Sequence, residues 1–418
     1  MRAALTTLAT SWNGHPTDEG FPAAHLLCLT DDAPLLLDVT RLIWRRWKGR
    51  LPTGIDRVCL AYLRHFGDRA QAVVQHDHLR RILDRRASHD LFALLEAPPE
   101  RFRARLLLRA LRHLNGLNCT GRGRLYLNIG HTGLDRPGFR HWVLRSEVSP
   151  IFLVHDLIPI THPEFCRPGE AERHRERMRT VLTTASGVIG NSKATLDALA
   201  ELARDEALPN PPGVVAWLGV DPLRAPQRAA QPDKPTFVIL GTIEARKNHK
   251  MLLDIWSRLI DRMGERTPRL LIVGQRGWEA NDVFERLDND RKLLGYVTEI
   301  GRCNDDELAS HLASARALLF PTFVEGYGLP LVEALGLGVP VIASDLQVFR
   351  EIGGDIPAYL DPFDERAWEV AILDYAQLNS DDRAAQLERM KGYCAPSWES
   401  HFDKVEAWLS SLGAPAST

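Results

Sequence analysis

The sequence lacks several features that would place it in a special class of protein. No run of about 18 apolar residues occurs, so no membrane-spanning helix is predicted. The apolar stretch within residues 1–20 is too short for a secretory signal peptide. The six cysteines are scattered without pairs at metal-ligand spacing, which is typical of free thiols in a reducing compartment. We therefore expect a cytoplasmic protein without a structural metal site.

The sequence also has little net charge, −2 over 418 residues. A chain with this balance and no recognition motif is not expected to bind nucleic acid. The charge is unevenly spread, because residues 1–210 hold 30 Lys and Arg against 23 Asp and Glu, whereas the remainder holds 22 against 31. A chain of this length exceeds one compact core, so we expect two domains that meet different partners.

The stretch Phe320–Val341 carries the most distinctive pattern in the sequence. A buried strand, Ala315–Phe320, precedes the string EGYGLP at residues 325–330. A helix is predicted to begin near Pro330 and to end near Gly336 or Gly338, since proline suits the first helical position. Glycines let the backbone approach a ligand closely, and the free amides of a helix N-terminus attract anions. We therefore predict that the backbone around residues 327–329 binds a phosphate group.

Two carboxylates flank this glycine turn, Glu325 before it and Glu333 on the helix behind it. Eight helical steps would separate them by roughly 12 Å, which exceeds the roughly 5–9.5 Å between the acid and the nucleophile of a glycosidase. Carboxylates accept hydrogen bonds from vicinal hydroxyls, so we expect this pair to bind the hydroxyls of a sugar or a ribose. A capped helix with a solvent-facing glutamate is the alternative.

A second strand, turn and helix follows the same order at residues 237–260. The turn carries Arg246 and Lys247, two adjacent cations at the predicted carboxyl edge of a sheet. They suit a diphosphate, because charge-assisted hydrogen bonds contribute about 1.5–3 kcal/mol each. A solvated basic loop is the alternative interpretation of this pair.

The first half of the chain contains two further strand ends. Ala33–Ile43 begins as a strand and is expected to run into a basic loop before Gly54 opens a helix. A later strand, IFLVHD at residues 151–156, delivers His155 to its carboxyl end, where ligands of open α/β sheets bind. His155 is therefore a site candidate, with a buried core histidine as the alternative.

Residues 100–124 predict a basic amphipathic helix on which Arg101, Arg105 and Arg109 share one face. One interpretation is an ordinary surface helix that packs on the first domain. The other is a patch for a membrane surface or for an anionic acceptor, and Trp44 and Trp47 among nearby basic residues support it.

The frame EGYGLPLVEALGLGVPVIAS, with seven residues between Glu325 and Glu333, resembles the donor-site motif of retaining glycosyltransferase family 4. The resemblance covers roughly residues 35–412 and is most specific at 237–250 and 297–344. It implies the GT-B architecture, an α/β fold in which two Rossmann-like parallel-sheet domains face a cleft. It also implies the domain bounds: 1–225 for acceptor binding, 226–396 for nucleotide-sugar binding, and 397–418 for a helix that returns to the first domain.

The resemblance implies roles for individual residues. Lys247 matches the diphosphate-binding lysine of the family, and Arg246 is expected to replace an arginine that some members carry at the position of Thr242. His155 lies in a string, VHDLIPITHPEF, which resembles polysaccharide-building members, and it would act with Lys247 and Glu325 at the reacting centre. The implied donor-binding residues are Gly54, Arg246, Lys247, Gly301 and Arg302 near the base, Glu325, Gly326, Tyr327, Gly328, Leu329 and Glu333. Arg57, in the same turn as Gly54, is a further candidate, with a solvated helix residue as the alternative.

These roles imply transfer of a sugar from a nucleoside diphosphate to a hydroxyl of a glycan or lipid-linked acceptor, with retained configuration. Cations and amides would stabilise the leaving diphosphate, so no metal ion and no cofactor are expected. A mannose, rhamnose or fucose donor, a part in polysaccharide or lipopolysaccharide biosynthesis, and a position at the inner face of the cytoplasmic membrane follow from the same resemblance. The oligomeric state stays open.

Two other functions remain open. The chain could be a non-catalytic scaffold of a polysaccharide assembly, although the intact Lys247, Glu325 and Glu333 disfavour that reading. It could also be another enzyme of the same fold. A phosphorylase is disfavoured by the lack of a recognisable cofactor-lysine motif, and a nucleotide-sugar epimerase by the form of the donor motif.

Overall fold

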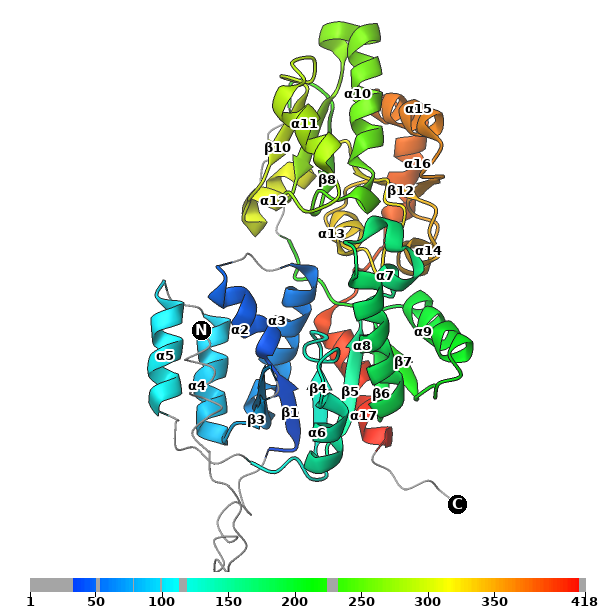
Figure 1. Ribbon diagram of the computed structural model, residues 1–418. Helices are drawn as coiled ribbons and strands as arrows, with labels where there is room; N and C mark the ends of the chain where they lie inside the picture. The colour runs from blue at the N-terminus through cyan, green and yellow to red at the C-terminus, as the bar shows by residue number, and fades with distance from the viewer. Residues whose placement is uncertain are drawn as a thin grey trace, which may run out of the picture.

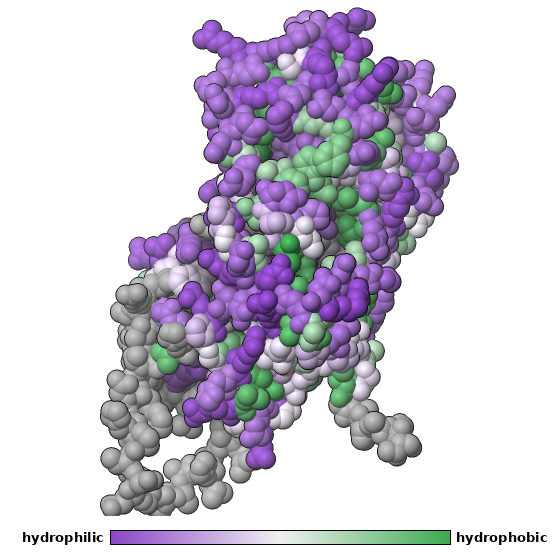
Figure 2. Space-filling view, turned by 45° about the vertical axis from the view of Figure 1, so that its right-hand side comes forward, coloured by the Kyte–Doolittle hydropathy of each residue, from purple (hydrophilic) through white to green (hydrophobic). Residues whose placement is uncertain are grey.

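The computed structural model has two α/β domains, one above the other in Figure 1, and describes residues 33–49, 53–77, 79–97, 100–112, 119–223 and 232–412. The expected lead-in at residues 1–25 and much of the expected linker between the domains lie outside the described residues. In the described ranges, no helix combines the length and the apolar character needed to cross a membrane. The face in Figure 2 is mostly polar over both domains.

The first domain is built on a seven-stranded sheet in which every neighbouring pair is parallel except β2 and β3. The strand order is β3-β2-β1-β4-β5-β6-β7, so the order reverses between β1 and β4. The strands are β1 (Leu35–Asp38), β2 (Ala70–His76), β3 (Leu79–Ile82), β4 (Leu125–Asn128), β5 (Ser149–Val154), β6 (Gly187–Gly190) and β7 (Gly213–Val215).

Helices connect these strands and cover the sheet (Figure 1). The α-helices are α2 (Thr40–Trp47), α3 (Gly54–Phe66), α4 (Arg85–Glu96), α5 (Phe102–Arg112), α6 (Phe139–Ser146), α7 (Ile158–Thr161), α8 (Glu170–Thr184) and α9 (Lys193–Asp205). Two 3-10 turns, η1 (Gly67–Arg69) and η2 (Pro163–Phe165), follow α3 and α7.

The second domain has a six-stranded, wholly parallel sheet in the order β10-β9-β8-β11-β12-β13. Its order reverses between β8 and β11. The strands are β8 (Thr236–Leu240), β9 (Arg269–Val273), β10 (Val297–Ile300), β11 (Ala317–Phe320), β12 (Val341–Ser344) and β13 (Ala358–Leu360). The helices are η3 (Ala245–Lys247), α10 (His249–Met263), η4 (Gly264–Arg266), α11 (Asn281–Asn289), α12 (Asp305–Ala313), α13 (Leu329–Gly336), α14 (Gln347–Gly353), α15 (Glu365–Ala376) and α16 (Asp381–Met390).

Unbroken apolar strands explain why both sheets are covered by helices. Strand β11 is buried along its whole length, as parallel strands between two helical layers are. Trp256 of α10 and Trp368 of α15 are fully buried in the core of the second domain. Each indole N–H is satisfied, because Trp256 donates to Pro268 O at 2.9 Å and Trp368 to Asp361 O at 2.9 Å.

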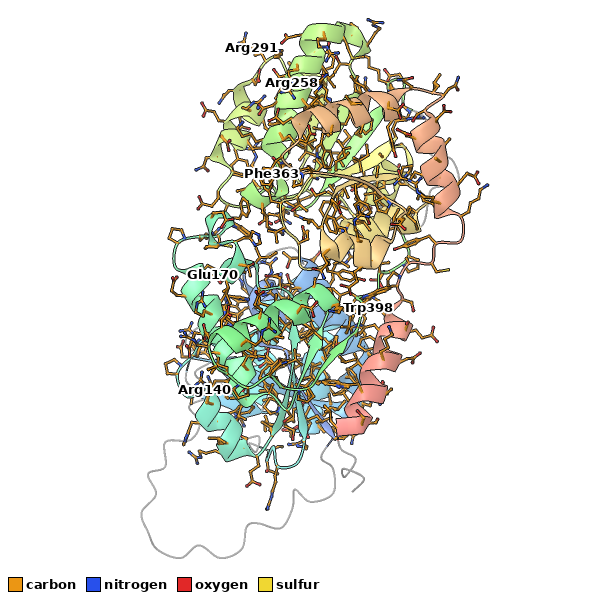
Figure 3. All side chains as sticks on the ribbon, turned by 90° about the vertical axis from the view of Figure 1, so that its right-hand side faces the viewer. Arg140, Glu170, Arg258, Arg291, Phe363 and Trp398 are labelled. Carbon is orange, nitrogen blue, oxygen red and sulfur yellow. The ribbon has the colours of Figure 1, made fainter. Side chains whose placement is uncertain are left out.

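The last helix, α17 (Trp398–Leu412), returns to the first domain, where it lies beside the sheet in Figures 1 and 3. Its His401 lies 2.9 Å from the hydroxyl of Tyr62, and the ring of Phe402 packs 5.1 Å from the ring of Tyr62. The returning helix was predicted from the family resemblance and is confirmed.

Two predictions of local structure were wrong. Residues 41–47 form most of helix α2 instead of a basic loop, because Asp38 Oδ1 accepts from Thr40 N at 3.0 Å at the helix start, while Leu42 and Ile43 face the core. The basic helix ends at Arg112, well before residue 124.

Helix α5 packs on the first domain through Phe102 and Leu106, as the surface-helix interpretation expects. It leaves Leu108 exposed and places Arg103 over the ring of Trp47, 5.6 Å from its centroid. The membrane-surface interpretation stays a prediction.

Candidate active site

A cluster of four charged side chains lies where the order of the second sheet reverses. Glu325, in the loop after β11, binds both Lys247 Nζ and Arg246 through the same oxygen, Oε1. Arg246 lies 2.7 Å from this oxygen and also 2.7 Å from Glu244 Oε1. Because β8 and β11 are neighbours with parallel direction, their carboxyl-end loops meet at the crevice where α/β sheets bind ligands.

Hydrogen bonds to backbone carbonyls join the loop after β8 to the loop after β11. Phe323 N donates to Arg246 O at 2.8 Å, and Thr322 Oγ1 donates to the same carbonyl at 2.9 Å. In return, the Arg246 guanidinium donates to Val324 O at 3.0 Å. The relative position of Lys247 and Glu325 is therefore fixed before any ligand arrives.

Burial and neighbouring charge act against each other in this cluster. Burial favours the neutral acid of Glu325, but Arg246 and Lys247 together hold its pKa below the usual range. Burial lowers the pKa of Lys247, against the attraction of Glu325. Burial also raises the pKa of Glu244, whose Oε2 is buried and finds no hydrogen-bond partner within the described residues. The cluster therefore holds two cations against two carboxylates in one buried place.

The glycine turn before α13 has the backbone geometry that the predicted anion site requires. Gly328 caps the helix with φ +114°, and a Cβ built there would lie 2.7 Å from Phe349, so glycine alone fits. In the described part of the chain, the amides of residues 327–329 donate no hydrogen bond. These amides and the positive end of the helix dipole are available to an anion.

The first domain supplies the opposite wall. A Cβ built at Gly326 would lie 2.3 Å from the carbonyl oxygen of His155, so the turn and the end of β5 are in direct contact. Ser192, the N-cap of α9, donates its hydroxyl to Gly326 O at 3.1 Å. Gly54, at the start of α3, would place a Cβ 3.4 Å from Leu329. The structure thus brings four predicted site residues together across the domain boundary.

His155 is held as a neutral imidazole. Its Nε2 lies 2.7 Å from Ile129 O, which can only accept, so Nε2 carries the proton and Nδ1 is an acceptor. Burial lowers the pKa of His155 to about 4. The ring can accept a hydrogen bond from a hydroxyl but carries no charge near neutral pH.

Glu333 is separated from the charged cluster and has a partner in the other domain. It is buried on α13, and its Oε1 lies 2.5 Å from the Arg57 guanidinium of α3. Burial raises the pKa of Glu333, and Arg57 opposes this shift. The sequence placed Arg57 beside Gly54 but gave no sign that it would meet Glu333.

Gly301 and Arg302, the predicted base-site residues, lie exposed in the loop between β10 and α12. No contact joins them to the charged cluster within the described residues. Asp305, which follows them, acts on Glu333 through its charge. Their role in base binding stays a prediction.

Sequence reasoning passed over two residues at the site and one acidic string elsewhere. Glu244 and Thr322 order the two loops, yet neither stands in a pattern that would single it out. Asp288 and Asp290 form an Asp-x-Asp string, the spacing of some metal sites, but Asp288 pairs with Arg276 at 2.6 Å on the surface of α11. No group of three or more His, Cys, Asp or Glu that could hold a metal occurs in the described ranges.

The comparisons with known proteins agree with this site. The family model of glycosyl transferases group 1 matches residues 223–376, which contain the charged cluster and the α13 turn. The matched region runs through the second domain from β8 to the end of α15. Its Glu325, Lys247 and Glu333 all lie inside the matched glycosyl transferases group 1 region.

Curated relatives match the chain over part of their length. The O-antigen chain mannosyltransferase B of Escherichia coli is 35% identical over 164 residues, covering 38% of this chain and 42% of the relative. The O-antigen chain mannosyltransferase RfbU of Salmonella typhimurium is 37% identical over 142 residues, covering 34% of this chain and 38% of the relative. The chain therefore spans less than half the length of these curated relatives.

Solved structures show the same fold over both domains. The Anabaena Alr3699/HepE protein in complex with UDP is 16% identical with a TM-score of 0.61, and the match covers 90% of this chain and 99% of that one. A sucrose-phosphate synthase of Thermosynechococcus elongatus is 18% identical with a TM-score of 0.58, over 91% and 100%. The chain has the GT-B fold, as its sequence predicts.

Proposed function

We propose that this protein is a retaining glycosyltransferase that moves a sugar, with mannose the favoured candidate, from a nucleoside diphosphate to a hydroxyl of a glycan or lipid-linked acceptor. The observation that carries the proposal is the Arg246, Lys247 and Glu325 cluster beside the free amides of α13. Mannose is favoured because two of the relatives are named O-antigen mannosyltransferases. A polysaccharide-building role is proposed on the same ground.

The cluster can supply the main requirement of the reaction. When the bond between the sugar and the diphosphate breaks, negative charge builds on the departing phosphate oxygen. Lys247, Arg246 and the amides of residues 327–329 would stabilise this charge, since preorganised donors act without reorganisation. We propose that they take the place that a metal ion has in other transferases.

Retention of configuration requires the acceptor to enter on the face that the diphosphate leaves. The acceptor hydroxyl forms the new bond to the anomeric carbon as the phosphate bond breaks, and its proton passes to the leaving phosphate oxygen. Glu325 is freed from Lys247 as the diphosphate takes over the lysine, and it would bind a sugar hydroxyl. Nδ1 of His155 would accept a hydrogen bond from a second hydroxyl.

The buried charges also weigh against a scaffold role. Removing charges from water carries a penalty of several kcal/mol per ion in typical interiors, only partly offset by pairing. A protein that binds no charged ligand gains nothing from keeping Glu244, Arg246, Lys247 and Glu325 together in one buried place. A transferase would use both cations to bind the diphosphate in every catalytic cycle.

Transfer can be tested with purified protein, radiolabelled GDP-mannose, UDP-glucose, ADP-glucose and dTDP-rhamnose, and a bacterial lipid-linked glycan extract as acceptor. The proposal predicts transfer from one of the donors, undiminished by EDTA, and an NMR coupling of the product that matches the donor anomer. No transfer from any donor would refute the catalytic role. Transfer that EDTA abolishes, or an inverted product, would refute the proposed mechanism.

A further inference from the structure

The contact between Glu333 and Arg57 joins two elements that are far apart in the sequence. Glu333 is 4% exposed, and its Oε1 is 2.5 Å from the Arg57 guanidinium. The other charges that act on Glu333 come from Asp305 of α12 and Asp221 in the segment between the domains, and both are negative. A buried carboxylate facing two further negative groups would be poorly stable as an anion without Arg57.

The start of α3, which carries Arg57, is anchored within the first domain. Asp56, the residue before it, is buried and caps α3 by accepting from Thr53 N at 2.7 Å. The same carboxylate binds Arg41 at 2.7 Å and Arg45 at 2.8 Å, which ties α3 to α2. The Arg57 side chain is one-third exposed, so part of its guanidinium remains open to a ligand.

The start of α3 faces the start of α13 directly. Gly54 would place a Cβ 3.4 Å from Leu329, and Arg57 and Glu333 lie one turn further along the two helices. Within the described residues only Oε1 of Glu333 has a partner, which leaves Oε2 to accept a hydrogen bond. The pair therefore lies next to the α13 turn, and the charge of Asp305, at the start of α12, acts on it.

We propose that Arg57 is a donor-site positioning residue from the first domain, which holds Glu333 as an oriented anion so that its free oxygen accepts from the ribose hydroxyls of the nucleotide. This inference rests on the proposed function and adds to it a specific coupling between donor binding and the contact of the two domains. The positive charge of Arg57 is what the site requires. If the contact between Arg57 and Glu333 were only structural, removing Arg57 would weaken nucleotide binding by the same factor at every pH.

The test is a calorimetric titration of UDP, GDP, ADP and dTDP into the wild type and into the variants Arg57→Gln, Glu333→Gln and Arg57→Gln/Glu333→Gln, from pH 6 to pH 9. For the nucleotide that binds wild type, R57Q should weaken affinity about 10- to 100-fold at pH 7, the loss expected of a charge-assisted hydrogen bond. Affinity should recover as the pH rises, because loss of Arg57 raises the pKa of Glu333 and higher pH restores its charge. The double variant should bind no worse than E333Q.

Arg258→Gln is the matched control, since Arg258 pairs with Glu365 and Glu369 at 3.0 Å near the top of the second domain, away from the site (Figure 3). It should bind like wild type. Wild-type affinity in R57Q, or a loss that is the same at all pH values, would overturn the inference while leaving the proposed function intact. If no nucleotide binds wild type, the proposed function fails and the inference falls with it.

Discussion

Glu325 determines how the charged cluster responds to a ligand. One of its oxygens is shared by Lys247 and Arg246, so a diphosphate that takes over the cations also releases the carboxylate. Arg246 keeps a second partner in Glu244, whereas Lys247 has Glu325 and the face of the Phe320 ring, 4.6 Å away. Lys247 therefore loses fewer ion pairs than Arg246 when it binds a phosphate.

Substitution Lys247→Ala should reduce transfer by about 10²–10³-fold, the usual effect of removing one preorganised donor. Glu325 would still be paired with Arg246, so the protein should stay folded. Initial rates and circular dichroism of the variant would check both statements. Lys250→Ala is the matched control, because Lys250 is exposed on α10 and pairs with Asp254 at 2.8 Å. A K247A enzyme with the rate of K250A would contradict the role.

The protonation state of His155 predicts how the transfer rate depends on pH. Its pKa is about 4, so it stays neutral throughout the range from about pH 5.5 to 8. We expect His155→Ala to lower turnover without removing an inflection from the profile in that range. Rates measured across the range for wild type and variant decide this. An inflection near pH 6.5 that vanishes in the variant would show that His155 titrates during catalysis.

Among single residues, those next to a distinctive string could be predicted from the sequence. Glu325, Lys247 and Gly328 lie in local patterns whose chemistry is readable without a structure. Arg57 was a candidate through its place in the same turn as Gly54, but its contact with Glu333, 276 residues away, could not be predicted. Glu244 could not be found, since only the fold shows that it is buried beside Arg246.

Among the elements, the α13 turn depends on contacts made by α9 and β5. Ser192 caps α9 through Thr195 N at 3.1 Å, and it also donates to Gly326 O. The second bond crosses between the domains, so only the three-dimensional structure shows it. Helix α2 was mistaken for a loop because its basic and aromatic residues hide an apolar face of only two or three residues.

Gly326→Ala tests this element directly. Its Cβ would lie 2.3 Å from His155 O, so the turn must move, and overpacking of this kind costs about 1–3 kcal/mol. We expect a lower melting temperature and slower transfer. Gly67→Ala, whose Cβ would meet Phe92 at an ordinary 3.6 Å, should keep both properties. Equal behaviour of the two variants, measured by thermal unfolding and initial rates, would contradict the contact.

For the whole molecule, the domains are held in contact at several places besides Arg57 and Glu333. Glu351 of α14 accepts from the α9 amide of Lys193 at 2.8 Å, and the Tyr327 hydroxyl donates to Leu218 O at 2.9 Å. The rings of Phe165 and Phe323 stack 5.2 Å apart. Two domains and the returning helix could be predicted from length and resemblance, but these contacts required three-dimensional coordinates.

Acid should destabilise the molecule through its buried neutral histidines. The pKa is lowered by burial to about 4 in His155 and His401 and to about 3 in His249. The unfolded state takes up protons below its pKa of about 6.5, whereas the folded state does not. Stability is therefore complete above that pH and falls by about 1.4 kcal/mol per pH unit for each histidine as the pH drops towards 4.

The variant His401→Gln isolates one of these contributions. Urea denaturation between about pH 5 and 6 measures the slope of the unfolding free energy against pH. In the variant this slope should be smaller than in wild type by the contribution of one proton, about 1.4 kcal/mol per pH unit. An unchanged slope would show that His401 is already charged in the folded protein. Burial makes that outcome unexpected, because it lowers the pKa of His401 to about 4 although the hydrogen bond to Trp217 O opposes the shift.

Calorimetric titration of UDP, GDP, ADP and dTDP into wild type and Lys247→Ala, with and without EDTA, tests the central claim most directly. The account predicts that one nucleotide binds wild type, that EDTA does not change its affinity, and that K247A binds it about tenfold or more weakly, as loss of a charged hydrogen bond implies. Absence of binding by every nucleotide, or equal affinity in K247A, would contradict a donor site at the Lys247 and Glu325 cluster.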